Sequence, residues 1–406
     1  MNKYKHSPVQ CAEFLLPAAE NMEKWPVVAC DQYTAEPAYW EKAEQIVGDA
    51  PSALRLILPE AYLHQDAGRI EKIHTTMETY LQQGIFARSI NGMVLTERTT
   101  ESGVRVGIVL AVDLEQYDYT RGSKPVIRPT EGTVTERIPP RLKVREGAAV
   151  ELSHVLLLID DPACTVVEPL YQQRTQLECL YDVELMQGGG HARGWALPEG
   201  ELTLQVQEKL AELAEKLSAD MPLIAVGDGN HSLATARAHW LKVREGLSEE
   251  ERKTHPARYA MAEVENLHCE ALIFEPIHRL VFDKTADEVL AMLKGARVTE
   301  AEYDAVIVGV DGDVKIKFDA PIHPLPVGCV QMLLDEHKDV EIDYIHGEGS
   351  VRALVAAGKG TGILVPAMNK SLLFPAVAQG GVLPRKTFSM GEAHEKRYYM
   401  ETRKIL

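Results

Sequence analysis

A helix, a short buried strand, a glycine turn and a second helix follow one another between residues 202 and 246. This order constrains the fold more than any other feature of the chain. In "LTLQVQEKLAELAEKLSAD" (202–220) apolar residues recur on one helical face. "MPLIAVGDGN" then supplies an apolar run too short for a helix, and "SLATARAHWLKVREG" (232–246) returns to a helical pattern. Such alternation indicates an α/β arrangement, in which helices cover the faces of a sheet.

Other segments extend this prediction to the rest of the chain. "VRVGIVLAVDL" (104–114) is β-branched and reads as a strand, and "AVELSHVLLLIDDP" (149–162) is apolar enough for a central strand. "TADEVLAMLKGA" (285–296) predicts a helix, and "YDAVIVGVDGDVKIKFDA" (303–320) predicts a β-hairpin around "DGD". The fold class is therefore α/β, of mixed α+β character, with mixed β-sheets and flanking helices.

The length of 406 residues is too great for one small core, so we expect two or three subdomains. No linker or internal repeat marks their limits, and the turns near residues 120 and 285 offer the best boundaries. The expected parts are an N-terminal α/β subdomain (1–120), a central subdomain (121–284) and a C-terminal α/β subdomain (285–406).

Composition narrows the class of protein. The net charge of −17 disfavours binding to nucleic acid and to anionic membranes. No run approaches the 18 or so apolar residues of a membrane span, and the first residues lack the pattern of a secretory signal. Six scattered cysteines without a C-x-x-C pair indicate reduced thiols. We expect a cytoplasmic enzyme or binding protein, and a homo-oligomer stays open.

The turn "VGDGNHSLAT" concentrates polar side chains between the short strand and the following helix. The first N–H groups of a helix and its dipole form an anion site, and flanking glycines allow a phosphate to approach. Asp228 is a candidate general base or Mg²⁺ ligand, and His231 a candidate proton shuttle. The alternative is an ordinary turn in which Asp228 caps the helix and His231 is solvated. The candidate residues here are Gly227, Asp228, Gly229, Asn230, His231 and Ser232.

A second candidate is the basic segment 124–146, which carries six basic and three acidic residues in an acidic chain. Arginine suits a bidentate grip on phosphate or carboxylate, and threonine hydroxyls add donors. The alternative is that these arginines pair with acids of the protein itself. We expect this segment and the glycine turn to converge on one positively lined pocket. Its candidate ligand-binding residues are Arg128, Thr130, Thr133, Arg137, Arg141 and Arg145.

The C-terminal "LPRKTFSMGEAHEKRYY" (383–399) adds Lys386 as a candidate phosphate contact, although a basic pair there is also typical of a solvated surface. Several motifs are absent from the sequence, namely the P-loop, the dinucleotide fingerprint, the G-x-S-x-G elbow and H-E-x-x-H. No pattern points to NAD, flavin, haem, PLP or structural zinc.

Four blocks together resemble the bacterial family called domain of unknown function 1015. They are "IRPTEGTVTERIPPR", "IAVGDGNHSLATA", "EPIHRLV" and "LPRKTFSMGEAHEKRYY", and the resemblance runs across nearly the whole chain. The family's name assigns no activity.

The glycine turn alone is similar to the D-G-H-H-R phosphate-binding turn of the ParB/sulfiredoxin superfamily, which includes nucleotide-binding proteins and a free-serine kinase. Asp228, Gly229 and His231 match that motif, whereas Asn230 and Ser232 replace its first His and its Arg. The resemblance implies a phosphate grip supplied from elsewhere, by Arg128, Arg137 or Arg141. It also implies a glutamate base, for which Glu136 and Glu131 are candidates.

These patterns favour a phosphate-handling enzyme that transfers a phosphoryl group from a nucleotide (ATP or ADP), with Mg²⁺, to a small polar metabolite such as an amino acid. Asp228, His231 and Glu136 are its candidate catalytic residues, and Asp228 is the candidate Mg²⁺ ligand. Two alternatives stay open. One is a phosphatase of a phosphorylated metabolite, and the other is a non-catalytic sensor of an anionic metabolite or nucleotide.

Overall fold

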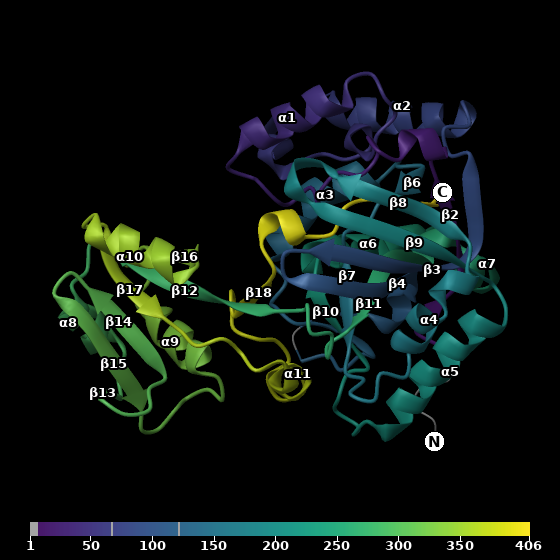
Figure 1. The fold of residues 1–406 in the computed structure, drawn as a ribbon. Coiled ribbons are helices and arrows are strands. Elements are labelled where there is room, and N and C mark those ends of the chain that lie inside the picture. The colour runs from purple at the N-terminus through teal and green to yellow at the C-terminus, as the bar shows by residue number, and fades with distance from the viewer. Residues whose placement is uncertain (1–6, 66–67, 121) are drawn as a thin grey trace. The chain divides into compact units, whose positions relative to one another are not determined.

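The computed structural model describes residues 7–65, 68–120 and 122–406 and divides the chain into two compact units. The first unit combines residues 1–272 with 392–406, and the second contains residues 273–391. Both units are sheets flanked by helices, which confirms the predicted mixed α/β class (Figure 1).

The first unit is built on a mixed twelve-stranded sheet. In spatial order its main path is β5 (Ile127–Pro129), β10 (Ile224–Asp228), β7 (Leu156–Ile159), β11 (Tyr259–Asn266), β4 (Gly103–Asp113), β3 (Arg88–Thr100), β2 (Ala12–Leu16), β19 (Thr402–Lys404) and β6 (Val150–Glu151). Off this path, β1 (Val9–Gln10) pairs with β4, and β9 (Gly190–Pro198) pairs with β3 and with β8 (Cys179–Leu185). β5–β10 and β7–β11 are parallel, and the other pairs of this sheet are antiparallel.

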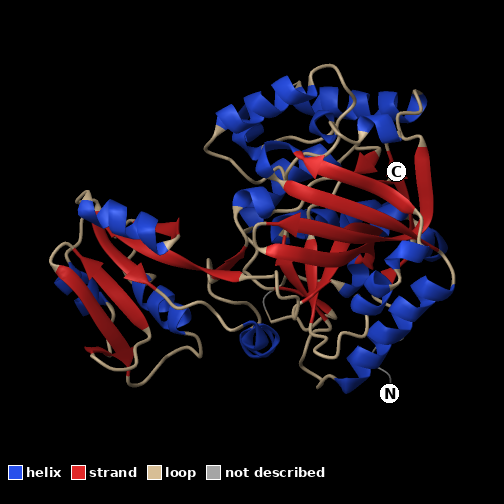
Figure 2. Ribbon diagram, viewed as in Figure 1, coloured by secondary structure: helices blue, strands red, loops and turns tan. Residues whose placement is uncertain are grey.

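Helices cover both faces of this sheet (Figure 2). They are α1 (Pro37–Val47), α2 (Arg69–Gln82), α3 (Ile138–Arg145), α4 (Glu168–Gln172), α5 (Glu201–Lys216), α6 (Asn230–Val243) and α7 (Glu249–Thr254). Successive strand residues face opposite ways, so Val94 joins the core beneath α1 and α2, whereas Met93 and Leu95 join the core beneath α5 and α6. Across the described residues, no helix combines the length and apolar character that a bilayer crossing needs.

The predicted order of elements between 202 and 246 is confirmed by α5, β10 and α6. The single strand predicted over 149–162 is wrong, because the chain forms β6, leaves the sheet, and re-enters it as β7 at a different place. β6 pairs with β19, while β7 lies between β10 and β11. The polar break between them contains His154.

The second unit is a seven-stranded antiparallel sheet. Its main path is β13 (Ala296–Val298), β15 (Gly312–Phe318), β14 (Ala305–Gly309), β17 (Gly360–Leu364), β12 (Phe274–Phe282) and β16 (Ile342–His346), and β18 (Phe388–Met390) also pairs with β12. Its helices are α8 (Ala286–Met292), α9 (Pro326–Leu334), α10 (Glu348–Ala356) and α11 (Leu373–Gly380). The predicted hairpin is confirmed, since β14 and β15 pair up to Gly309 and Gly312 across a tight turn.

The division of the chain differs from the expected three parts. β4 ends before residue 120 and β5 begins after it, yet both strands lie in the same sheet, so no division falls there. The chain instead leaves the first unit at 272 and returns to it at 392. The returning segment supplies β19 and places Lys396 and Tyr399 in the first unit.

Candidate functional site

Two segments about a hundred residues apart meet where β5 and β10 run parallel, with Ala225 opposite Arg128. The carboxyl ends of parallel strands open at one edge of a sheet, where ligand sites form in open α/β folds. Thr130 Oγ1 donates to the carbonyl of Val226 over 2.6 Å, and the amide of Val134 donates to His231 Nε2 over 3.2 Å. The segment after β5 is therefore hydrogen-bonded to the glycine turn after β10, as the sequence predicts.

The turn itself depends on glycine. A β-bulge at Gly227 shifts the register between β10 and β7. Gly229 is the N-cap of α6 with φ +79°, and a Cβ there would lie 3.0 Å from the Cα of Val155 and 3.4 Å from Cδ2 of His154. No side chain among the described residues caps α6, and Asn230 Oδ1 is buried without a hydrogen-bond partner there. The first backbone N–H groups of α6 thus face the edge with the dipole of a 14-residue helix behind them.

Asp228 ends β10 with both carboxylate oxygens engaged. Oδ2 accepts from Lys396 Nζ over 2.9 Å, and Oδ1 accepts from the amide of Gly229 over 2.9 Å. Burial alone would raise the pKa of Asp228, but the ammonium of Lys396 and the imidazole of His154 outweigh burial and lower that pKa. The carboxylate therefore stays ionised at neutral pH and fixes Lys396 at the turn.

His154 lies beside Gly229 at the centre of a buried polar cluster. Its Nε2 is 3.6 Å from Oδ2 of Asp31, and its Nδ1 is 2.7 Å from the hydroxyl of Tyr399, which also accepts from the amide of Cys30. Burial disfavours the charged ring, yet Asp31, Cys30 and Asp228 together raise the pKa of His154 to about 10. His154 is therefore an imidazolium at neutral pH, only 8% exposed.

A cavity of about 130 Å³ adjoins this cluster. Cys30, His154, Ser232 and Tyr399 contribute to its wall, together with aliphatic side chains of the surrounding helices and loops. A volume below the 300–1,000 Å³ typical of sites for drug-sized ligands suits a molecule of only a few non-hydrogen atoms.

Three of the predicted arginines interact with the protein itself. Arg128 is 2% exposed in β5, and its Nε donates to the carbonyl of Pro125 over 3.1 Å. Arg141 on α3 forms an ion pair with Glu60, and Arg145 forms one with the buried Glu151 at 2.6 Å. Arg141 and Arg145 nevertheless line the cavity, so these two ion pairs form part of its wall.

The remaining predicted residues lie in different surroundings. Thr133 Oγ1 is buried beside the phenol of Tyr117. Glu136 and Arg137 are exposed on a 3₁₀ turn (Thr135–Arg137) that directly precedes α3. Lys386 is exposed in the second unit, with φ +55°.

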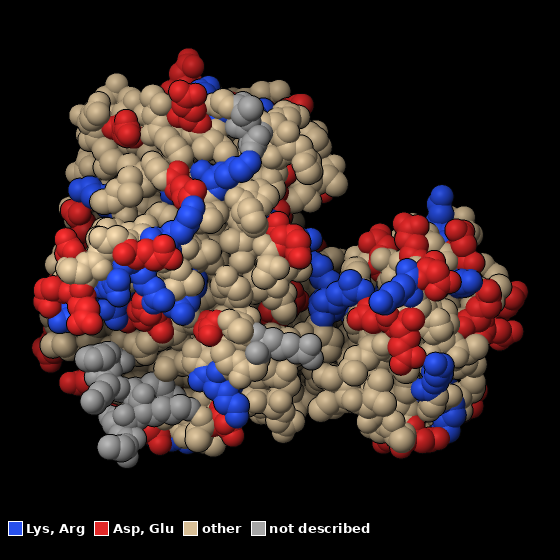
Figure 3. Space-filling view, turned by 180° about the vertical axis from the view of Figure 1, so that it is seen from behind, with Lys and Arg blue, Asp and Glu red and all other residues tan. Residues whose placement is uncertain are grey.

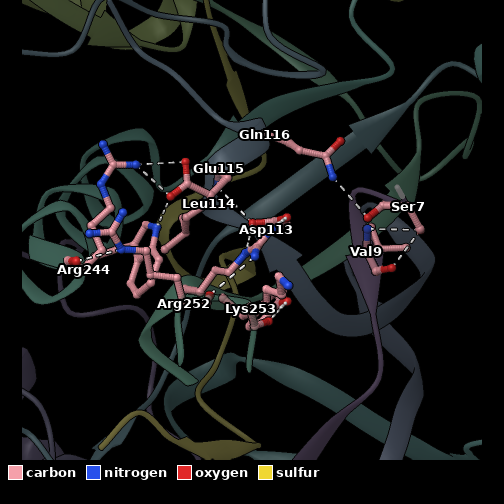
Figure 4. Close-up of polar contacts among 12 residues, drawn as sticks. Ser7, Val9, Asp113, Leu114, Glu115, Gln116, Arg244, Arg252 and Lys253 are labelled. Carbon is pink, nitrogen blue, oxygen red and sulfur yellow. Dashed lines mark hydrogen bonds and ion pairs between the residues drawn. The ribbon is translucent and has the colours of Figure 1, made fainter. Parts of the chain in front are cut away.

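The far end of α6 is anchored to the end of β4 by a polar network. Trp240 Nε1 donates to Glu115 Oε1 over 2.6 Å, and Arg244 Nη1 donates to the same carboxylate over 2.8 Å (Figure 4). Arg258 forms a bidentate pair with Asp113 at 3.0 and 2.7 Å. These bonds hold α6 at its C-terminal end, which keeps its N-terminus at the edge of β10.

Within the described parts of the chain, no group of three or more His, Cys, Asp or Glu side chains forms a metal cage. Mg²⁺ needs only one or two carboxylates when substrate phosphates complete its shell. Asp228, the predicted ligand, already accepts from Lys396 and Gly229, so it fits Mg²⁺ only if Lys396 is displaced.

Asp31, His154, Lys396 and Tyr399 were not singled out as site residues by the sequence. His154 interrupts an otherwise apolar run, and Lys396 and Tyr399 lie in the block "LPRKTFSMGEAHEKRYY", so all three positions carried a signal. Their convergence with Asp228 depends on the return of the chain to the first unit, which no local pattern reveals.

Comparison with known proteins gives the following matches. Among solved structures, a free serine kinase in complex with AMP aligns at TM-score 0.40 and 14% identity, covering 73% of this chain and 92% of that one. A conserved hypothetical protein from Pyrococcus furiosus aligns at TM-score 0.35 and 12% identity over 72% and 90% of the two chains. SbnI from Staphylococcus aureus, truncated at its C-terminus, aligns at 0.37 and 11% over 73% and 81%. No curated protein matches the chain.

The family comparison covers most of the sequence. The family described as "Protein of unknown function (DUF1015)" matches residues 14–363, which include β5, β10, α6 and His154. This match contains three of the four sequence blocks and ends before the fourth, at 383–399. The chain therefore belongs to the DUF1015 family.

Proposed function

We propose that this chain transfers a phosphoryl group from a nucleotide to a small polar metabolite, and that the edge formed by β5, β10 and α6 is its phosphate site. One observation carries the proposal: the uncapped N-terminus of α6 shares this edge with Lys396 and with the imidazolium of His154. Backbone N–H groups at a helix N-terminus and cationic side chains are the groups that stabilise phosphoryl oxygens.

The chain's own residues would bind phosphate in two ways, through neutral backbone N–H groups and through charged side chains. The backbone N–H groups of Asn230, His231 and Ser232 bind phosphate oxygens without a side-chain charge. Lys396 and His154 offset the negative charge that the phosphates bring. Arg137, which forms no ion pair with any described residue, is the predicted arginine that remains available to reach a bound nucleotide.

Asp228 is better suited to position Lys396 than to act as the base, because its pKa is lowered and Lys396 Nζ holds its Oδ2 at 2.9 Å. We assign the base to Asp31, whose carboxylate is 28% exposed and lies 3.6 Å from His154. Its neighbour Cys30 lines the cavity in which the acceptor hydroxyl would sit. Glu136 is exposed on the turn before α3, and we propose only that it contacts the bound nucleotide.

The test is an assay of the full chain with ATP or ADP, Mg²⁺ and a panel of small hydroxyl-bearing metabolites, among them hydroxy amino acids. Lys396→Met should weaken nucleotide binding by roughly 30-fold, since a hydrogen bond to a charged group is worth about 2 kcal/mol. Asp31→Asn should lower turnover while nucleotide binding persists. Lys209→Met is the matched control, because Lys209 pairs with Glu212 on the exposed face of α5.

The outcomes separate the alternatives. Nucleotide consumption that depends on an acceptor supports the transferase. Phosphate released from a phosphorylated metabolite without nucleotide would indicate a phosphatase. Nucleotide-dependent thermal stabilisation without turnover would indicate a sensor. Nucleotide binding that is equal in wild type and Lys396→Met would overturn the assignment of the site.

A further inference from the structure

The sheet of the second unit carries a cavity of about 700 Å³ on one face, and this cavity is independent of the proposed phosphate site. α10 covers one end of that face, where Val351 and Val355 pack on Leu280 and Val308. The rest of the face lines the cavity with strands β12, β14, β15 and β17. Its volume lies in the range of sites that bind small ligands.

Part of the cavity wall is apolar and open to solvent. Val298 is 54% exposed and Tyr303 is 49% exposed, and Val306 of β14 is half-buried. A ligand that covers these side chains would remove apolar surface from water, which favours binding by about 25 cal/mol for each Å² buried.

One charged cluster of the wall is paired within the protein. Arg352 on α10 pairs with Asp313 of β15 at 2.8 Å and with Glu348 of its own helix at 2.7 Å. These bonds join α10 to β15 beside the cavity. The guanidinium of Arg352 therefore has two carboxylate partners. This cluster fixes the wall and keeps a net charge of −1, which also favours a cationic ligand.

The other charged groups of the wall form fewer polar contacts within the protein. Glu275 and Glu300 form no ion pair or hydrogen bond through their carboxylates with any described residue. Lys315 Nζ lies 5.4 Å from the centre of the Tyr303 ring and forms no ion pair among the described residues. His278 is 6% exposed and burial lowers its pKa, so its ring is neutral, and its Nδ1 accepts from the amide of Val365 over 3.2 Å. The proton of His278 therefore sits on Nε2.

We propose that this cavity binds a basic α-amino acid. Two carboxylates without partners, Glu275 and Glu300, match the two cationic groups of such a ligand, and Lys315 with the Nε2–H of His278 matches its carboxylate. The wall carries four acids and two bases, a net charge of −2, which favours a cationic ligand. The aliphatic stem of the ligand would cover Val306 and the ring of Tyr303.

The proposal is tested by calorimetric titration of the full chain with lysine, arginine and ornithine, and with leucine, glutamate and putrescine for comparison. We expect the basic amino acids to bind and the other three to bind more weakly. Glu300→Gln and Lys315→Met should each raise Kd by about fivefold, the effect of one partly exposed ion pair. Lys317→Met is the matched control, because Lys317 lies two residues further along β15 and pairs with Glu302.

Circular dichroism would show that each variant keeps its fold. Absence of heat and of thermal stabilisation with every basic amino acid would overturn the proposal. Binding that Glu300→Gln and Lys315→Met leave unchanged would overturn it as well, because the ligand would then occupy another place. Tighter binding of leucine or glutamate would overturn the assigned ligand class. None of these variants lies in the first unit, so nucleotide-dependent turnover tests the phosphate site separately.

Discussion

Replacement of His154 by glutamine should change how the stability of the first unit depends on pH. In the folded chain the pKa of His154 is raised from 6.5 to about 10, because Asp31, Cys30 and Asp228 outweigh the opposing effect of burial. Each pKa unit is worth about 1.4 kcal/mol, so the imidazolium contributes roughly 5 kcal/mol when the ring is charged in both states. The ring is 8% exposed, so solvent screens this interaction little.

The direction of this pH dependence follows from the number of protons that the folded and unfolded states bind. Below pH 6.5 both the folded and the unfolded ring are protonated, and the full contribution is present. Between pH 6.5 and about 10 only the folded ring keeps its proton, so stability falls by about 1.4 kcal/mol for each pH unit. The advantage of wild type over His154→Gln should therefore shrink steadily over this window as pH rises.

Urea unfolding followed by tryptophan fluorescence measures this effect in the intact chain. All four tryptophans lie in the first unit, at positions 25, 40, 195 and 240, so their emission reports that unit alone. The quantity of interest is the difference in unfolding free energy between wild type and variant, measured at several values from about pH 7 to pH 9. A difference that stays constant over this range would show a neutral His154 and refute the charge assigned to the site.

Two further predictions concern the same unit. Gly229→Ala should destabilise it by roughly 2 kcal/mol or more, because φ is +79° and the new Cβ would press on the backbone of Val155. The midpoint of urea unfolding measures this loss, and an unchanged midpoint would contradict the close approach. Burial and Glu263 raise the pKa of Glu265 from 4.5 to about 7 despite Arg105, so the folded state holds a proton that the unfolded state has lost. Relative to wild type, Glu265→Gln should therefore gain up to roughly 3 kcal/mol in unfolding free energy between pH 4.5 and about 7. A difference in urea unfolding that does not change with pH would show an ionised Glu265.

Local pattern predicted the elements around the candidate site. α5 shows the helical spacing of Val206, Leu210 and Leu213, all of which are buried, and β10 shows an apolar run ended by glycine. The meeting of the basic segment with the glycine turn was also expected from charge and turn chemistry. The parallel pairing of β5 with β10 provides that meeting.

Long-range contacts account for what the sequence did not reveal. Residue spacing cannot show that Arg141 and Arg145 meet Glu60 and Glu151, since each pair depends on how the chain folds back. The run 149–162 is apolar throughout its middle, and its division into two strands follows from pairing with partners distant in the sequence. Lys396 reaches Asp228 across 168 residues because the chain re-enters the first unit at 392.

The central claim is that phosphate binds where α6 begins. A crystal structure of the full chain with a non-hydrolysable ATP analogue tests this claim most directly. The account predicts terminal phosphate oxygens within about 3 Å of the backbone nitrogens of Asn230 to Ser232 and of Lys396 Nζ. A nucleotide whose phosphates lie elsewhere, while Lys396 remains paired with Asp228 at an empty turn, would contradict it.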